Sequence, residues 1–262
     1  MSEHTFVIPA YKQSPYLESC IQSLLGQSMS STITLTTSTP SNFLQRLAEK
    51  YDLSYHVNPK SGNIAGDWNF ALSKASTKFV TIAHQDDIYA PDYVAEVVKA
   101  INKNKDVLIA FTSYSDLVEG KIRDSSLNSF VKSALLWPFF FSKTLKSRYS
   151  KRAVLLFGDP ISCPTVTFNM EMVNKDFAFS EAYSCALDWL AWLELSKCEG
   201  SFLYINQKLV QHRIHPDSET TNQLSLGKRQ KEEFQIFESM WGKHMARVIS
   251  RLYAAGYKDN DV

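Results

Sequence analysis

The chain has 262 residues, of which 44% are hydrophobic and 21% charged, and this balance is that of an ordinary globular protein. Its length suits one large α/β domain, or two small ones, with a well-buried core. The formal net charge of +1 argues against a protein that binds nucleic acid through a strongly basic surface, so we expect no nucleic-acid partner.

The spacing of the cysteines and the shortness of the apolar runs indicate the cellular compartment of the protein. Cys20, Cys163, Cys185 and Cys198 show no Cys-x-x-Cys spacing and sit in apolar segments, which predicts reduced core thiols rather than disulfides or a zinc site. The amino terminus lacks the features of a signal peptide, and the longest apolar run, Ala134–Phe141, is far shorter than the ~20 residues that span a bilayer. We expect a cytoplasmic protein that is soluble or lies peripherally on the inner membrane face.

The first half of the chain alternates between strand-like and helical segments. The strand-like segments are 5–9, 32–37, 53–57, 78–83 and 107–113, and the helical ones are 14–27, 40–51, 62–76 and 91–102. This rhythm predicts an α/β fold with a mostly parallel sheet wound on both faces. After about residue 115 the rhythm breaks. There we expect strands at 161–168, 201–205 and 209–214, and helices at 186–198 and 224–253.

Two adjacent carboxylates follow the apolar run 78–83, in the segment His84-Gln-Asp-Asp87. A buried strand therefore ends in two like charges at its carboxyl edge, which is the edge where open α/β sheets bind ligands. Hard divalent ions that carry nucleotide phosphates use such oxygen ligands. The alternative is an ordinary turn that caps the following helix, and an isolated acidic pair favours this second interpretation.

Three other motifs accompany the acidic pair. A strand, a tight turn and an amphipathic helix follow one another over 7–27, and Gly62 leads a helix whose free N–H groups could face an anion. Further on, Asp188 lies in the apolar helical segment 186–192, and 212–215 reads His-Arg-Ile-His. In this order the motifs resemble those of the inverting family 2 glycosyltransferases of the GT-A fold, over roughly residues 4–220.

The resemblance implies a fold, a reaction and a domain plan. It implies one GT-A domain over 1–223, with a nucleotide-binding half (1–115) and an acceptor-binding half (116–223), followed by a helical extension over 224–262. It implies transfer of a sugar, with inversion, from a nucleotide-diphosphate sugar such as a UDP-sugar. The acceptor would be a saccharide or a lipid-linked saccharide, in bacterial cell-surface polysaccharide synthesis. The implied cofactor is Mn²⁺ or Mg²⁺. The sugar, the linkage and the oligomeric state cannot be read from the sequence.

The resemblance also assigns roles to individual residues. The catalytic base maps on Asp188, and the metal ligands map on Asp87 and His215. The residues that contact the nucleotide map on Pro9, Ala10, Tyr11, Gly62, Asn69, Asp86 and Arg213. Elementary chemistry agrees with this division, because inverting transfer needs one base for the acceptor hydroxyl and charge stabilisation for the departing diphosphate.

The chain departs from the family pattern in three places. The second strand ends without the usual acidic residue, so the hydroxyls of Thr37 or Ser38 would have to contact the nucleobase. Leu187 stands where an acidic residue usually precedes the base, and Trp68 stands where an arginine is common. These departures keep two alternatives open, a non-catalytic sugar-nucleotide-binding protein of the same fold and a nucleotidyltransferase. A nucleotidyltransferase would need a glycine-rich loop after the first strand, but the segment after this strand contains no glycine.

Residues 125–158 contain six cations, no carboxylate and an aromatic cluster around 137–141. One interpretation is a packed core with a solvated basic face. The other is a surface that docks on an anionic leaflet, where aromatic side chains sit at headgroup depth, or that lines an acceptor groove.

Overall fold

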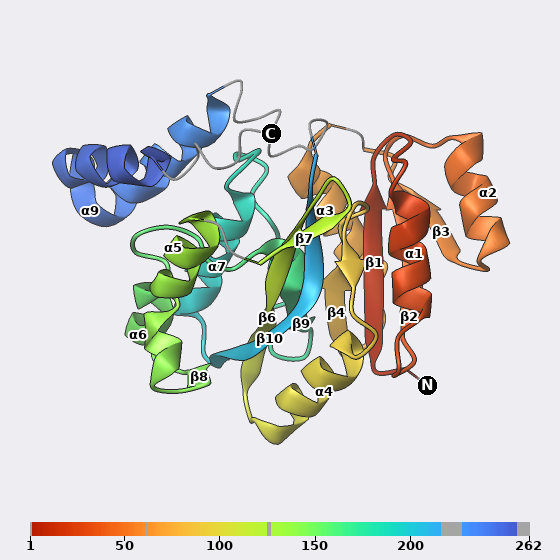
Figure 1. Cartoon of the computed structure of the whole chain (residues 1–262), viewed down its shortest axis with the longest axis horizontal. Helices are drawn as coiled ribbons and strands as arrows, with labels where there is room; N and C mark the ends of the chain where they lie inside the picture. Colours follow the sequence, from red (N-terminus) through yellow and green to blue (C-terminus); the bar gives the residue numbers. More distant parts are fainter. Residues whose placement is uncertain (1, 61, 125–126, 216–226, 256–262) are drawn as a thin grey trace.

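The computed structural model describes residues 2–60, 62–124, 127–215 and 227–255. Its central sheet has the strand order β3-β2-β1-β4-β9-β6-β10-β5, with β7 paired to β6 and β8 to β10 (Figure 1). The strands are β1 His4–Ala10, β2 Thr32–Thr37, β3 Ser54–Val57, β4 Phe79–Ile82, β5 Ile88–Tyr89, β6 Val107–Val118, β7 Lys121–Arg123, β8 Thr144–Leu145, β9 Val166–Asn169 and β10 Ser201–Ile214.

Parallel ladders hold most of the paired residues. They join β3, β2, β1 and β4 on one side and β6 with β10 on the other, and β9 runs antiparallel between β4 and β6. The carboxyl ends of β1, β2, β4 and β10 therefore share one edge of the sheet. The predicted α/β fold with a mainly parallel sheet is confirmed.

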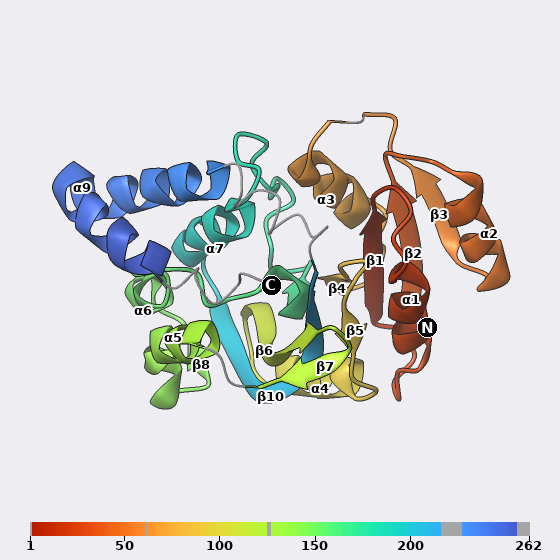
Figure 2. The same ribbon diagram turned by 45° about the horizontal axis from the view of Figure 1, so that its top comes forward.

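Helices cover both faces of the sheet (Figure 2). Neighbouring side chains of β1 point to opposite faces of the sheet. Phe6 and Ile8 pack in one hydrophobic cluster, and Val7 packs in the other. The first cluster contains α1 Leu17–Leu25, α2 Asn42–Lys50 and α4 Tyr93–Lys103. The second contains α3 Ile64–Ser73, α7 Leu187–Lys197 and part of α9 Lys228–Ala255.

The second half of the chain differs from the sequence prediction in three elements. The expected strand 161–168 begins with a short 3₁₀ helix, η2 Cys163–Thr165, because Pro164 lacks the N–H that a central strand needs. The two strands expected at 201–205 and 209–214 form one strand, β10, with register shifts between Ile205 and Val210. The helix expected at 224–253 is interrupted at Gly242, whose φ of 72° is outside the helical region.

Three elements at one end of the molecule had no prediction: α5 Leu127–Leu135, the 3₁₀ helix η1 Trp137–Phe140 and α6 Arg148–Ala153. They lie together at the lower left of Figure 1, with α9 above them. Helix α9 packs through Phe237, which is buried against Trp189 of α7. The predicted boundary at 223/224 lies outside the described residues. Within the described part of the chain, no helix is long and apolar enough to span a bilayer.

All four cysteines are free thiols. Cys20 and Cys163 are buried, as expected for core thiols, and Cys185 is half-buried. Cys198 is exposed, so its prediction as a core residue is wrong. It caps the carboxyl end of α7, where the chain turns toward β10 and leaves the apolar interior.

Candidate active site

The acidic pair lies at the carboxyl end of β4, in a turn closed by a hydrogen bond from the N–H of Asp87 to the carbonyl of His84. The Asp87 side chain is buried, and its Oδ1 accepts a hydrogen bond of 2.9 Å from the main-chain N–H of Arg213. Its Oδ2 has no hydrogen-bond partner among the described residues. Burial raises the pKa of Asp87 to about 7, and the negative charge of Asp86 adds to this rise.

Two residues at the end of β10 reach the acidic pair from across the sheet. Nε of Arg213 donates to the main-chain carbonyl of Asp86 at 2.8 Å, and Nε2 of His215 lies 3.0 Å from Asp86 Oδ2. The ring of Tyr16, beside the start of α1, packs against both, with 4.4 Å from its centre to the Arg213 guanidinium carbon. The structure therefore brings Asp86, Asp87, Arg213 and His215 together.

Burial alone would raise the pKa of Asp86, but its contact with His215 and the charges of nearby histidines lower this pKa below its ordinary value. The two neighbouring carboxylates thus differ in proton affinity. Asp86 is the readily ionised one, while Asp87 needs a further positive charge to remain ionised near neutral pH.

The donor atoms of this site fit a divalent cation. His84, Asp86 and Asp87 each offer one ligand atom, and these three atoms lie within 4.8 Å of one another. Burial lowers the pKa of His84 to about 4, which keeps the imidazole neutral as a metal ligand must be. A cation beside Asp87 Oδ2 would satisfy the buried oxygen that has no described partner. The His84 ring also packs against that of Trp68, with 5.1 Å between the ring centres.

The turn after β1 is tied directly to the acidic segment. The N–H of Tyr11 donates to Gln85 Oε1 at 3.1 Å, and Gln85 Nε2 donates back to the Tyr11 carbonyl at 3.3 Å. Ala10 is buried, Pro9 is half-buried and the Tyr11 ring is exposed. These three predicted nucleotide-contacting residues therefore border the edge that carries Asp86 and Asp87.

The end of β2 also borders this edge, and it meets a carboxylate that the sequence did not single out. Ser38 Oγ donates to Asp67 Oδ2 at 2.7 Å, and Asn58 Nδ2 donates to Asp67 Oδ1 at 2.8 Å. Thr37 is buried and its hydroxyl accepts from the N–H of Thr39. The acidic group missing from the end of β2 is thus present nearby, in the first turn of α3. The signal in the sequence was only an acidic residue in a first helical turn, which is common for other reasons.

Gly62 and Asn69, two residues predicted to contact the nucleotide, are placed differently from the sequence prediction. Asn63 caps the helix, with its Oδ1 accepting from the N–H of Gly66, so Gly62 lies outside the helix and is exposed. The Asn69 amide is bonded to the main chain of Phe179, donating to its carbonyl at 2.9 Å and accepting from its N–H at 2.7 Å. Asn69 therefore joins α3 to the loop before α7, and its role at the nucleotide stays a prediction.

Asp188 occupies the first turn of α7, where its Oδ1 accepts from the N–H of Trp189. Burial raises its pKa above the ordinary aspartate value, and the charge of Arg229 from α9 partly offsets this rise. A partly buried carboxylate with raised proton affinity is suited to act as a general base.

A second carboxylate, Asp159, lies near Asp188. Burial and the charge of Asp188 raise the pKa of Asp159 well above its ordinary value. Two tryptophans of α7 fix the loop that carries Asp159, since Trp189 Nε1 donates to the Leu155 carbonyl and Trp192 Nε1 to that of Ile161. No motif in the sequence pointed to Asp159, because only tertiary packing brings this loop to α7.

The acidic regions around Asp87 and around Asp188 both lie near Cys163. Burial raises the pKa of the Cys163 thiol, as do the charges of Asp188, Asp159 and Asp87, which places this cysteine within electrostatic reach of both regions. Its raised pKa agrees with the packing role predicted for Cys163 and disfavours a nucleophile.

A polar cluster near Asp87 involves His212. Its Nδ1 lies 3.7 Å from Asp116 Oδ1, and its ring meets that of Tyr114 edge-on at 5.7 Å. Burial alone would lower the pKa of His212, but Asp116 and Asp87 raise it. Lys132 of α5 donates to the Tyr114 hydroxyl at 2.8 Å, so α5 borders the same cluster.

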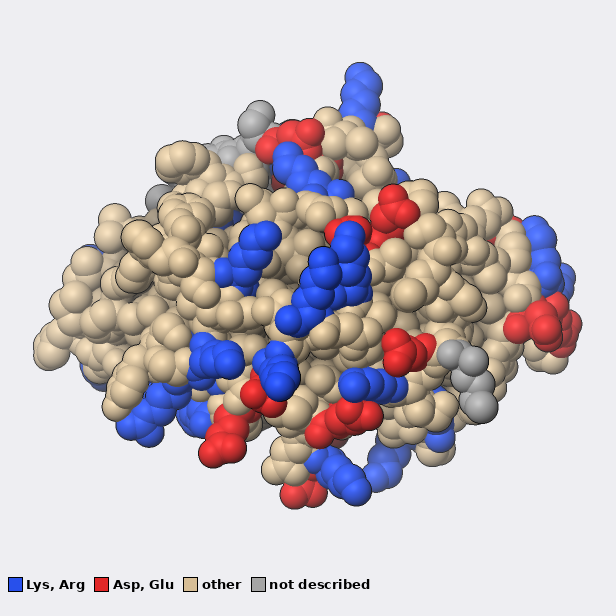
Figure 3. Space-filling view, turned by 90° about the horizontal axis from the view of Figure 1, so that it is seen from below, with Lys and Arg blue, Asp and Glu red and all other residues tan. Residues whose placement is uncertain are grey.

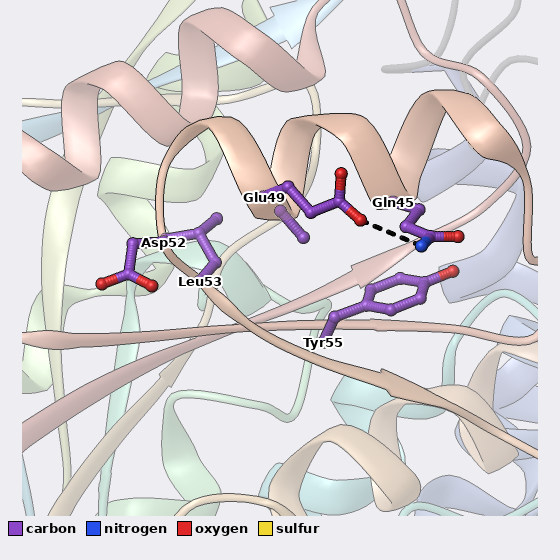
Figure 4. A pocket seen from close by; sticks show the side chains of 6 residues that line it. Gln45, Glu49, Asp52, Leu53 and Tyr55 are labelled. Atoms are coloured by element: carbon purple, nitrogen blue, oxygen red, sulfur yellow. Dashed lines mark hydrogen bonds between the residues drawn. The ribbon is translucent and has the colours of Figure 1, made fainter.

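One hollow of the surface lies elsewhere, between α2 and β3 (Figure 4). It has a volume of about 460 Å³, and Glu49 accepts a hydrogen bond from Gln45 across its rim. None of the predicted site residues lines it, so this hollow plays no part in the arrangement around Asp87.

Comparison with known proteins gives a consistent family. The model of a family described as glycosyl transferase family 2 matches residues 5–172. A hyaluronan synthase of Pasteurella multocida is 23% identical over 227 residues, covering 85% of this chain and 21% of that protein. An uncharacterized glycosyltransferase of Haemophilus influenzae is 23% identical over 218 residues, covering 80% of this chain and 64% of that protein. The chain thus spans less than two thirds of the length of either relative.

Solved structures share the fold at low sequence identity. S. aureus TarS 1–349 in complex with UDP-GlcNAc superposes with a TM-score of 0.65 at 14% identity, over 98% of this chain and 72% of that one. The mannosyltransferase PcManGT from Pyrobaculum calidifontis, in complex with GDP-Man and Mn²⁺, superposes with a TM-score of 0.60 at 12% identity, over 98% and 75%.

Proposed function

This chain belongs to glycosyl transferase family 2, and from that premise we propose that it transfers a sugar from a UDP-sugar, with inversion, to a saccharide or lipid-linked saccharide. The observation that carries the proposal is the buried Asp87. Its Oδ2 lacks a described partner beside a neutral histidine, while Arg213 and His215 converge on the same turn. We further propose that the reaction serves bacterial cell-surface polysaccharide synthesis at the cytoplasmic side of the membrane.

Asp86 and Asp87 would hold Mn²⁺ or Mg²⁺, with His84 or His215 as a nitrogen ligand. Such a cation, when bound, supplies positive charge to the diphosphate leaving group. Arg213 adds a fixed cation, because its guanidinium is held between the Asp86 carbonyl and the Tyr16 ring. Coordination through Nε2 of His215 would replace its contact with Asp86, whereas Nδ1 of His84 lies 4.0 Å from Asp87 Oδ2.

Asp188 would act as the general base. Its ionised carboxylate accepts the proton of an acceptor hydroxyl while that oxygen attacks the anomeric carbon. The bond from this carbon to the diphosphate oxygen breaks with its electron pair, and the nucleoside diphosphate departs on the opposite face. The raised pKa of Asp188 supports this role because it increases the affinity of the carboxylate for the transferred proton.

The proposed donor is a UDP-sugar, supported by the S. aureus TarS structures solved with UDP and with UDP-GlcNAc. Asp67, held by Ser38 and Asn58, is the proposed replacement for the acidic residue missing from the end of β2. Asp67→Asn should weaken UDP binding while leaving pyrophosphate binding unchanged, as measured by calorimetry. Equal weakening of both ligands would show that Asp67 acts on the phosphate side or on the fold.

A non-catalytic sugar-nucleotide-binding protein is the second candidate, favoured by the buried Leu187 in place of an acidic residue. Metal-dependent hydrolysis of a panel of nucleotide sugars without acceptor separates the two. Hydrolysis of one donor that stops in Asp188→Asn supports the transferase. Tight binding of nucleoside diphosphate without any turnover of the panel supports the second candidate.

A further inference from the structure

The elements α5, η1 and α6 expose an unusual set of aromatic side chains. Their exposed fractions are 71% for Phe130, 51% for Trp137, 70% for Phe140, 84% for Phe141 and 71% for Tyr149. Trp137 and Phe141 meet edge-on, with 6.4 Å between their ring centres. Aromatic rings of this size are normally buried, and exposed apolar patches mark interaction sites. Among the aromatic side chains of this segment, the core interpretation holds only for Phe139, which is buried against Phe111 and Tyr204.

The cations of the same segment divide into two groups. Lys132 and Lys151 are used inside the molecule, since Lys132 donates to Tyr114 and Lys151 to the carbonyls of Cys198 and Gly200. The others are exposed around the aromatic rings: Lys143, Lys146, Arg148 and Arg152. Residues 125–158 contain no carboxylate that could neutralise them.

We propose that this surface docks the protein on an anionic lipid bilayer. We call it the aromatic-basic face, and it comprises Phe130, Trp137, Phe140, Phe141 and Tyr149 with Lys143, Lys146, Arg148 and Arg152. In Figure 3 the left-hand end of the molecule is largely free of charge, and Lys and Arg side chains gather along its lower border. Aromatic rings at headgroup depth and cations facing anionic headgroups match the chemistry of that interface.

The aromatic-basic face is connected to the proposed acceptor side. Helix α5 carries Phe130 on this face and Lys132 toward Tyr114, and Lys132 lies within electrostatic reach of Asp159. Helix α6 packs on α7, whose first turn carries Asp188. A protein docked through α5, η1 and α6 would hold Asp188 near the bilayer surface. This part of the inference rests on the proposed function and identifies the acceptor as one anchored in lipid.

Co-sedimentation with vesicles tests the docking without any need for activity. The full chain should sediment with vesicles of phosphatidylcholine and phosphatidylglycerol at low salt, and binding should weaken at high salt and with phosphatidylcholine alone. Lys143→Gln with Lys146→Gln should lower the vesicle partition coefficient by about fivefold for each cation removed. The matched control is Lys103→Gln with Lys105→Gln, two exposed cations at the end of α4, which should leave partition unchanged.

Trp137 provides a local probe, because it is the most exposed of the five tryptophans. Its emission should shift to the blue on vesicle binding, and Trp137→Phe should abolish the shift while sedimentation persists. Phe140→Ser with Phe141→Ser should abolish sedimentation, whereas the control Ile122→Ser, at another exposed apolar site, should not.

Asp188→Asn should sediment like the wild type, so failure of the transferase proposal and failure of docking are distinguishable. Absence of lipid-dependent sedimentation at low salt would overturn the docking proposal. So would a dimer in solution that Phe140→Ser with Phe141→Ser converts to monomers, since a second copy would then cover this face.

Discussion

The main-chain N–H of Arg213 donates a hydrogen bond to the Asp87 carboxylate, and 126 residues of chain separate the two. The bond joins the ends of β4 and β10 and brings the Arg213 side chain over the same turn. It leaves one carboxylate oxygen of Asp87 buried and without a described partner. The proposed metal and diphosphate sites are thus both next to the hydrogen bond between Arg213 and Asp87.

Asp87→Asn should remove the metal-dependent part of nucleotide binding. The amide keeps the contact with the Arg213 N–H but loses the charge that a divalent ion requires. In a thermal-shift titration, Mn²⁺ should increase the stabilisation of the wild type by UDP and have no such effect on the variant. The control is Asp176→Asn at an exposed site. An undiminished Mn²⁺ effect in Asp87→Asn would place the metal elsewhere.

Asp188→Asn should leave UDP binding intact and lower turnover by about 10²–10⁴, the typical loss for a general base. The amide cannot accept the hydroxyl proton, while the fold around Trp189 keeps its hydrogen bond to the side-chain oxygen. Steady-state kinetics together with calorimetric UDP binding separate the two effects. Turnover near the wild-type rate would remove Asp188 from the mechanism.

Arg213→Ala and His215→Ala should each weaken binding of UDP more than binding of uridine. Both side chains meet at Asp86, where they would contact the diphosphate rather than the nucleoside. Loss of a charge-assisted hydrogen bond should cost Arg213→Ala roughly tenfold or more in affinity for UDP. Equal losses for both ligands, compared by calorimetry, would show that the segment contacts no phosphate.

Arg229→Gln should move the acid limb of the pH–rate profile to higher pH. The base works only when ionised, so activity is present above the pKa of Asp188 and falls as the pH drops through it. Arg229 lowers this pKa against the larger effect of burial, and its removal lets the pKa rise further. The rate at high pH should stay near that of the wild type. Arg152→Gln is the control, and an unchanged acid limb in Arg229→Gln would mean that a different group limits the reaction.

Gly158→Ala should destabilise the loop that carries Asp159. Gly158 has a φ of +150°, and an added Cβ would lie 2.4 Å from Cε2 of Tyr253 on α9. Overpacking of this kind costs about 1–3 kcal/mol, so the melting temperature should fall by several degrees. Gly120→Ala is a matched control with φ of +77° and open space around the new methyl group. A larger loss in the control would show that backbone strain outweighs the contact with Tyr253.

The resemblance placed Asp87 and Arg213 in one site, but their direct contact follows from the antiparallel pairing of β5 with β10, which the sequence did not predict. The sequence could not place Asp67 beside Ser38 or Asp159 near Asp188, since neither contact follows from strand order or helical periodicity. The role of Asn69 at the nucleotide stays a prediction. Its amide is engaged by the main chain of Phe179, a contact that only tertiary packing creates.

The aromatic residues of 137–141 show that composition alone does not predict which side chains are buried. Phe139 and Phe140 are neighbours with the same chemistry, yet one is buried and the other is 70% exposed. The 3₁₀ geometry of η1 decides which ring faces the core, and Pro138 at its start favours that turn.

Metal-dependent transfer with inversion is tested by proton NMR of donor turnover. With an α-linked UDP-sugar and Mn²⁺, the β-anomeric proton of the product should appear first. This signal should be absent for both Asp87→Asn and Asp188→Asn. Release of the α anomer, or UDP-sugar binding without turnover of any donor, would rule out the proposed transferase mechanism.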